Sequence, residues 1–150
     1  MPMPYTYRHA SAEFSSFLAK LRDELGNSSD NIAYTTTDAV FQVFRRRLSV
    51  PEALQFADIL PCVLRAIFLW RWMPAEPLPF GLRAEMTREV QAVRANHNWA
   101  PDHAILAVAR ALRSCVLASD LGPVLARLPE GAVAFWALPE GEARGDLLFP

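Results

Sequence analysis

Two segments of the sequence, 68 positions apart, carry the same features in the same order: DAVFQVFRRRL aligns without a gap with LAVARALRSCV, and ILPCVLRAIF with RLPEGAVAFW. The identical pairs are Ala39 and Ala107, Val40 and Val108, Arg45 and Arg113, Leu60 and Leu128, Pro61 and Pro129, and Ala66 and Ala134. In each half, an amphipathic helix precedes a helix containing Ala-Val, an acid-led short helix, and a Leu-Pro step into a helix that ends in aromatic residues. A unit of this size cannot bury a core alone. The repeat therefore predicts two tandem, similar four-helix units packed into one compact helical bundle.

The hydrophobic pattern predicts an all-α chain. Hydrophobic residues recur at helical spacing, and strict two-residue alternation with β-branched residues is missing. The predicted helices cover about residues 12–25, 31–48, 49–59 and 61–72 in the first half and 82–97, 101–117, 119–127 and 129–137 in the second. Ser29 or Asp30 is expected to cap the second helix. Ser49 and Glu52 have the spacing of a capping box at the start of the third.

The same pattern predicts a single domain built from two repeats. The domain spans residues 12–137, with repeats at 12–72 and 82–137. The connector between them, residues 73–81, contains three prolines and is expected to be extended and stiff. An N-terminal arm (residues 1–11) and a loosely held C-terminal tail (residues 138–150) flank the domain.

The charge balance gives no global attraction to nucleic acid. The net charge is −1, so the chain has no overall positive field. The one basic run, Arg45 to Arg47, fans around about 200° of a helix and cannot face a single phosphate strand. We interpret the run as cations at a helix C-terminus, with nucleic-acid contact as the alternative. No nucleic-acid partner is expected.

The cysteines and the first residues of the chain indicate the cytoplasm. Cys62 and Cys115 lie far apart without CxxC spacing, so neither a disulfide framework nor a zinc knuckle is predicted. Residues 1–14 lack the basic segment and apolar stretch of a secretion signal. The protein is therefore expected to be cytoplasmic.

The apolar stretch ILPCVLRAIFLWRW, residues 59–72, contains the candidate interaction surface. A spanning helix needs about 20 largely uncharged residues, and the window 53–73 contains polar and charged ones, so no membrane span is predicted. Patches that combine aromatic residues with Arg are common binding hot spots. The candidate residues are Arg65, Phe68, Trp70, Arg71 and Trp72. The alternative is a helix buried on most sides, with its arginines reaching outward.

No catalytic, cofactor-binding or metal-binding constellation is recognised. His97 and His103 flank NWAPD, but their spacing fits neither a helical zinc pair nor a CxxC-type site. Asp102 is expected to offset a helix dipole instead. The sequence thus favours a non-enzymatic module, without cofactor or metal, that binds a protein partner or forms a homo-oligomer. The alternative is a small-molecule-binding protein or enzyme, with a pocket between the repeats lined by aromatic residues, Arg65 and one of the two histidines.

The two halves also share an order of short motifs. The first half reads AY…DAV…L…EA…LP..LR…W, and the second reads A..AV…L…D…LP…FW. The residues that carry these motifs are Ala33, Tyr34, Asp38, Ala39, Val40, Leu48, Glu52, Ala53, Leu60, Pro61, Leu64, Arg65 and Trp72, then Ala104, Ala107, Val108, Leu112, Asp120, Leu128, Pro129, Phe135 and Trp136. This order resembles the bacterial family called domain of unknown function 2267, over roughly residues 14 to 137. The resemblance implies a duplicated all-α fold and assigns no activity.

Overall fold

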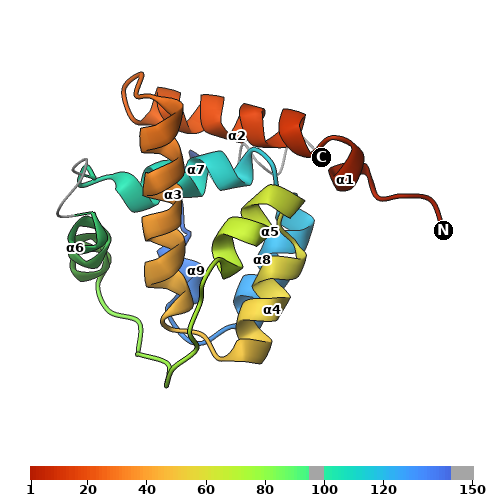
Figure 1. Cartoon of the computed structure of the whole chain (residues 1–150). Helices are drawn as coiled ribbons and strands as arrows, with labels where there is room; N and C mark the ends of the chain where they lie inside the picture. Colours follow the sequence, from red (N-terminus) through yellow and green to blue (C-terminus); the bar gives the residue numbers. More distant parts are fainter. Residues whose placement is uncertain (95–99, 143–150) are drawn as a thin grey trace.

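The computed structural model describes residues 1–94 and 100–142, and every regular element in these ranges is a helix (Figure 1). The helices are α1 (Tyr5–Arg8), α2 (Ala10–Glu24), α3 (Asp30–Arg45), α4 (Val50–Asp58), α5 (Cys62–Leu69), α6 (Arg83–Val93), α7 (Ala104–Arg113), α8 (Ala118–Arg127) and α9 (Ala132–Phe135). No helix within the described ranges is long and apolar enough to cross a membrane. The prediction of an all-α fold is confirmed.

Two of the helix starts predicted in the first half, those of α3 and α4, are confirmed by their caps. Ser29 caps α3, because its Oγ accepts a hydrogen bond from the Ile32 N–H at 3.2 Å. Ser49 and Glu52 form a capping box at α4. The Ser49 Oγ accepts from the Glu52 N–H at 3.4 Å, and the Glu52 Oε1 accepts from the Ser49 N–H at 2.7 Å. Each cap pairs backbone donors that the first turn of a helix leaves unsatisfied.

Replacing the capping serine tests this local assignment. Ser49→Ala is expected to lower the free energy of unfolding by about 1 kcal/mol, because the first turn of α4 loses a side-chain acceptor. Urea denaturation measures the change. Ser16→Ala is the matched control, since Ser16 is exposed in the interior of α2 and caps nothing. Equal effects of the two substitutions would contradict the role of Ser49 as a cap.

The helix α5 ends earlier than predicted. Its last helical residue is Leu69, whereas the sequence predicted a helix to Trp72. Trp70 has an extended backbone (φ −60°, ψ 119°), and Arg71 has φ 52°, a conformation that an α-helix of L-residues does not contain. Trp70 and Arg71 therefore form a turn at the end of α5 and do not continue the helix.

Two helices of the second half, α6 and α9, also differ in length from their predictions. The predicted helix 129–137 is reduced to α9, because Gly131 precedes it with φ 101°. Only glycine fits there, since a side chain at Gly131 would overlap Phe80. The predicted helix 82–97 is described as far as Val93, and its residues 95–97 lie outside the described ranges.

One helix, α1, was not predicted and lies within the N-terminal arm. The rings of Tyr5 and His9 stack with their centroids 3.9 Å apart. The Cys62 N–H donates a hydrogen bond to the Thr6 Oγ1 at 2.9 Å, which ties α1 to the start of α5. A four-residue helix shows no periodicity, and an isolated turn is unstable in water, so these contacts determine it.

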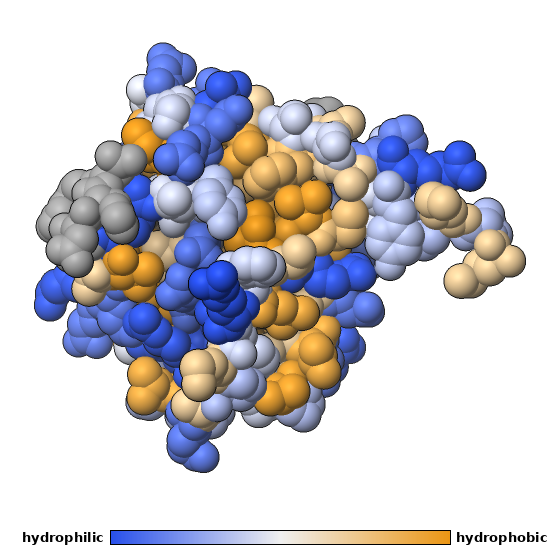
Figure 2. Space-filling model, in the orientation of Figure 1, coloured by the Kyte–Doolittle hydropathy of each residue, from blue (hydrophilic) through white to orange (hydrophobic). Residues whose placement is uncertain are grey.

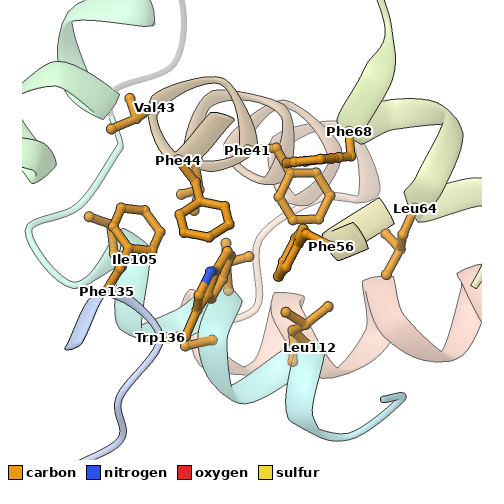
Figure 3. Packing of buried hydrophobic residues seen from close by; sticks show 14 of the residues in the cluster. Phe41, Val43, Phe44, Phe56, Leu64, Phe68, Ile105, Leu112, Phe135 and Trp136 are labelled. Atoms are coloured by element: carbon orange, nitrogen blue, oxygen red, sulfur yellow. The ribbon is translucent and has the colours of Figure 1, made fainter. Parts of the chain in front are cut away.

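The helix α3 lies at the centre of the fold and packs against α2, α5, α6 and α7 (Figure 1). Two of its side chains, Phe41 and Phe44, belong to a cluster of buried rings (Figure 3). The other rings of the cluster are those of Phe56, Phe68, Phe135 and Trp136. The Phe44 ring centroid lies 5.0 Å from that of Phe135 and 5.2 Å from that of Trp136, in the tilted and edge arrangements that aromatic pairs favour. These rings come from both halves of the sequence, so the chain is compact and has one shared core.

Candidate functional site

Trp70 and Arg71 form the exposed end of α5. The Trp70 side chain is 59% exposed, and the Arg71 guanidinium lies over its ring, 5.4 Å from the centroid. This distance is typical of a cation–π contact. The positive φ of Arg71 is uncommon for a residue with a side chain and persists only where the surroundings hold it. The pair is therefore displayed on the surface in a defined geometry.

Phe68 does not belong to this surface, and its prediction as a surface residue was wrong. Its side chain is fully buried, and its ring centroid lies 5.0 Å from that of Phe56 and 5.4 Å from that of Phe41. Residues two apart on a helix point in nearly opposite directions, so Phe68 enters the core where Trp70 leaves it. Trp72 is half-buried and packs against the edge of the core.

Arg65 lies in the first half of α5 and holds that helix to α4. Its Nε donates to the Ala57 carbonyl at 3.0 Å, and its Nη2 donates to the carbonyls of Asp58 and Leu60 at 3.2 Å each. These carbonyls are at the C-terminus of α4, where a cation satisfies both the unpaired acceptors and the helix dipole. Arg65 is thus a structural residue, and the structure does not bring it together with Trp70.

Arg45 is the residue that positions Trp70, and sequence reasoning missed this role. Its buried Nη1 donates to the Phe68 carbonyl at 2.8 Å and to the Trp70 carbonyl at 3.2 Å. Burial lowers the pKa of Arg45, and the nearby Asp38 carboxylate partly offsets that effect. The prediction placed Arg45 at the C-terminus of its own helix, whereas its guanidinium bonds the last carbonyls of α5. The sequence contained one signal for this role, because Arg45 aligns with an identical residue, Arg113, at an offset of 68 positions.

The other two arginines of the basic run contact α3 and α6. Arg47 is buried, donates to the Val43 carbonyl at 2.9 Å, and forms a short ion pair with Glu89. Arg46 also reaches Glu89, with its Nη1 3.2 Å from Oε1. Burial alone would raise the pKa of Glu89, but the hydrogen bonds and charges of the two arginines outweigh it, and the pKa is lowered. The run is therefore engaged within the fold and does not form a basic strip on the surface.

The outer face of α5 is apolar as well as its inner face. On the inner face, Leu64, Ile67 and Phe68 are buried. On the outer face, Val63 and Leu69 are half-exposed and Ala66 and Trp70 are exposed. Their spacing of three and four residues places them on one side of the helix. Figure 2 shows hydrophobic residues gathered over the region where Figure 1 places α5. We call Val63, Ala66, Leu69, Trp70 and Arg71 the α5 surface.

The connector borders two grooves. One, of about 300 Å³, is lined by Gln42, Arg45, Arg46, Trp72, Met73, Ala75, Glu76 and Leu78. The other, of about 700 Å³, lies between the connector and the link from α8 to α9, and its lining is Leu78, Pro79, Phe80, Gly81, Leu82, Glu85, Pro129, Glu130 and Gly131. Where the two halves meet in the core, the rings of Phe44, Phe135 and Trp136 pack directly on one another.

Of the residues around the two histidines, Asp102 and His103 are described, and both form hydrogen bonds within the fold. His97 lies outside the described ranges. His103 is exposed, with its Nε2 3.0 Å from the Glu24 carbonyl oxygen. Asp102, predicted to offset a helix dipole, accepts a hydrogen bond from the Gln91 Nε2 at 3.0 Å. Among the residues that the structure describes, no group of His, Cys, Asp and Glu side chains could hold a metal ion.

Comparison with known proteins identifies the family. A search of the curated proteins found no match. Over residues 14–135, the chain matches the family described as "Uncharacterized conserved protein (DUF2267)". The match covers most of the chain and agrees with the resemblance found in the motif order. The chain therefore belongs to the DUF2267 family of uncharacterized conserved proteins.

Proposed function

We propose that this protein is a non-enzymatic cytoplasmic module that self-associates through the α5 surface. The observation that carries the proposal is Trp70, a large aromatic side chain that is 59% exposed beside an exposed Arg71. Trp and Arg are enriched among the residues that dominate binding energy at interfaces. Contiguous apolar surface next to them is typical of protein contact sites. Two free cysteines are in keeping with a reducing compartment.

The way in which Trp70 is held also supports a binding role. A buried arginine, Arg45, donates to the carbonyls on either side of Leu69, so the backbone that carries the indole is fixed from inside. Ordering an interface side chain costs about 0.5–1.5 kcal/mol on association. A side chain that is already ordered avoids much of that cost. The α5 surface is therefore suited to contact a partner without rearrangement.

The proposal includes a duplicated fold of two four-helix units. Two contacts support it: Arg45 donates to the Phe68 carbonyl, and Arg113 donates to the Trp136 carbonyl at 2.9 Å. Both pairs are 23 residues apart, and the two contacts are related by the 68-residue offset of the sequence repeat. In each case, an arginine at the end of an Ala-Val helix bonds the end of the aromatic-ended helix. The second unit has no counterpart of the exposed Trp70, since Leu138 occupies its position.

A charge placed on the α5 surface tests self-association. Trp70→Glu is expected to weaken the dimer at least tenfold, because a hot-spot aromatic is worth about 2 kcal/mol or more and a carboxylate resists burial. Light scattering after size-exclusion chromatography measures the mass of each variant. Leu82→Glu is the matched control, because Leu82 is 70% exposed and lies outside the α5 surface. A Trp70→Glu variant that remains as dimeric as the control would overturn the proposal.

Small-molecule binding is the second candidate, and the larger groove favours it. The groove beside the connector has a volume of about 700 Å³ and is bordered by Phe80, Leu82 and Glu85. Its size lies within the range of about 300–1,000 Å³ that is common for ligand pockets. Ligands that bind the folded state raise the melting temperature. A ligand library that never shifts the melting temperature would count against this candidate.

A further inference from the structure

The segment before α2 is apolar, exposed and directed away from the body of the protein. We call residues 1–8 the α1 segment. Met1 and Met3 are exposed, and Tyr5 and Tyr7 are 69% and 54% exposed. Figure 1 shows the residues before α1 leading away from the other helices. Apolar side chains in such a segment gain little from their own chain, so a contact with another surface would stabilise them.

We infer that the α1 segment of one copy binds the α5 surface of a second copy, and that the exchange is reciprocal. This inference rests on the self-association proposed above and names the contact that produces it. The occupant of the α5 surface is then a second copy of this chain. The case depends on where the α1 segment is anchored, how far it reaches, and how much area it can cover.

The anchor of the α1 segment is the first residue of α5. The Cys62 N–H donates to the Thr6 Oγ1 at 2.9 Å, and the Cys62 thiol donates to the Thr6 carbonyl at 3.4 Å. Stacking of Tyr5 on His9 further orders the turn. The α1 segment therefore leaves the fold beside one end of the α5 surface. The Pro4 carbonyl still accepts from the Tyr7 N–H at 3.1 Å, but within the described part of the chain no backbone hydrogen bond holds residues 1–3 against their own copy.

A two-fold axis near Cys62 would place each α1 segment along the α5 surface of the other copy. In a two-fold interface the same patch is used by both copies, so the segment and the surface must be neighbours, as they are here. The four residues before α1 span about 13 Å when extended. The eight residues of α5 span about 12 Å. The segment thus reaches from the Cys62 end of α5 to Trp70.

Charge and area agree with this arrangement. When Met1 lies near Trp70 of the other copy, Arg8 lies near the first turn of that copy's α5. The exposed Asp58 precedes this turn in the sequence, and its carboxylate has the opposite charge to Arg8. Tyr5, Tyr7 and Trp70 together expose about 270–450 Å² per copy, taking about 150–250 Å² for a whole aromatic side chain. Two copies then contribute about 550–900 Å² from these rings alone. Stable interfaces bury about 1,200–2,000 Å² in total, and the methionines and the aliphatic residues of α5 supply the rest.

Mixing two complementary variants tests the exchange. One variant carries Met3→Lys and Tyr5→Lys in the α1 segment, and the other carries Trp70→Glu in the α5 surface. All three positions are exposed, so both variants are expected to keep the helical circular dichroism of the unmodified protein. Each variant alone is expected to dimerise at least tenfold more weakly in sedimentation equilibrium. An equimolar mixture is expected to regain a dimer, because it pairs one intact segment with one intact surface and places the lysines opposite the glutamate.

The outcomes separate this inference from the proposed function. If the lysine variant dimerises as well as the unmodified protein while Trp70→Glu does not, the α5 surface mediates the dimer and the exchange of α1 segments is refuted. A mixture that stays monomeric also refutes the exchange. If Trp70→Glu has no effect, the proposed function itself is refuted.

Photo-crosslinking gives a second, direct readout. A benzophenone amino acid at position 3 is expected to crosslink to the α5 peptide of a differently tagged copy, detected by mass spectrometry. The matched probe at position 82, an exposed residue directly after the connector, is expected to give no crosslink to α5 of the other copy. Crosslinks from position 3 that are confined to its own copy would overturn the exchange.

Discussion

Trp136→Ala is expected to lower the free energy of unfolding by about 3–5 kcal/mol, the range for truncating a large buried aromatic residue. The Trp136 side chain is fully buried at the centre of the ring cluster (Figure 3). Its ring centroid lies 5.0 Å from that of Phe135, 5.2 Å from that of Phe44 and 5.7 Å from that of Phe56. These neighbours come from α9, α3 and α4, so the cavity would open where both halves of the chain meet. Domains are stable by only about 5–15 kcal/mol, so this loss is large.

The conservative substitution separates packing from hydrogen bonding. The Trp136 Nε1 is buried and has no hydrogen-bond acceptor among the described residues. Trp136→Phe therefore keeps a ring in the cluster without breaking a hydrogen bond, and it is expected to cost about 1–2 kcal/mol through the smaller volume. Urea denaturation of both variants measures the difference. Equal losses for Ala and Phe would show that ring packing at this position is not what stabilises the core.

Arg45→Met is expected to lower the free energy of unfolding by about 2–3 kcal/mol. The substitution leaves the carbonyls of Phe68 and Trp70 without their donor, and an unsatisfied buried polar group costs about 1–3 kcal/mol. Burial disfavours the charge of Arg45 and lowers its pKa, so part of the loss is offset when methionine replaces it. The lost hydrogen bonds still dominate, because two acceptors are affected at the end of one short helix.

The neighbouring arginine provides the control for this substitution. Arg46 is 41% exposed, and its contact with Glu89 is a surface ion pair worth less than about 1 kcal/mol. Arg46→Met is therefore expected to change stability little. Hydrogen exchange gives a second readout, since the amide of Trp70 should exchange faster in Arg45→Met than in Arg46→Met. Similar stability and exchange in the two variants would contradict the role of Arg45 as the support of Trp70.

The parts of the fold that depend on local chemistry could be predicted from the sequence. The cap at Ser29 and the capping box of Ser49 and Glu52 are short-range hydrogen bonds with a fixed residue spacing. The break at Pro61 follows from the missing N–H and the restricted residue before proline. These features need no knowledge of the rest of the chain, so they appear in the structure where the sequence places them.

The end of α5 could not be predicted, because it depends on contacts distant in the sequence. Arg71 takes a positive φ, and Arg45 bonds the carbonyl of Trp70 from 25 residues away. Which residues of α5 are exposed could not be predicted either. Both faces of α5 are apolar, so periodicity cannot tell which face is the core, and Phe68 was assigned to the wrong one. The alignment at an offset of 68 residues contained a clue, since it pairs Arg45 with Arg113, and these arginines bond the carbonyls of Phe68 and Trp136, which the same offset also pairs.

The most direct test of self-association is sedimentation velocity of the unmodified chain over a series of concentrations. The monomer has a mass of 16.8 kDa. An interface at the lower end of the standard size, with an aromatic hot spot, is expected to give a dissociation constant on the order of micromolar. The predicted result is a weight-average mass that rises from the monomer to the dimer across that range. A mass that stays at the monomer value up to about 1 mM would contradict the account.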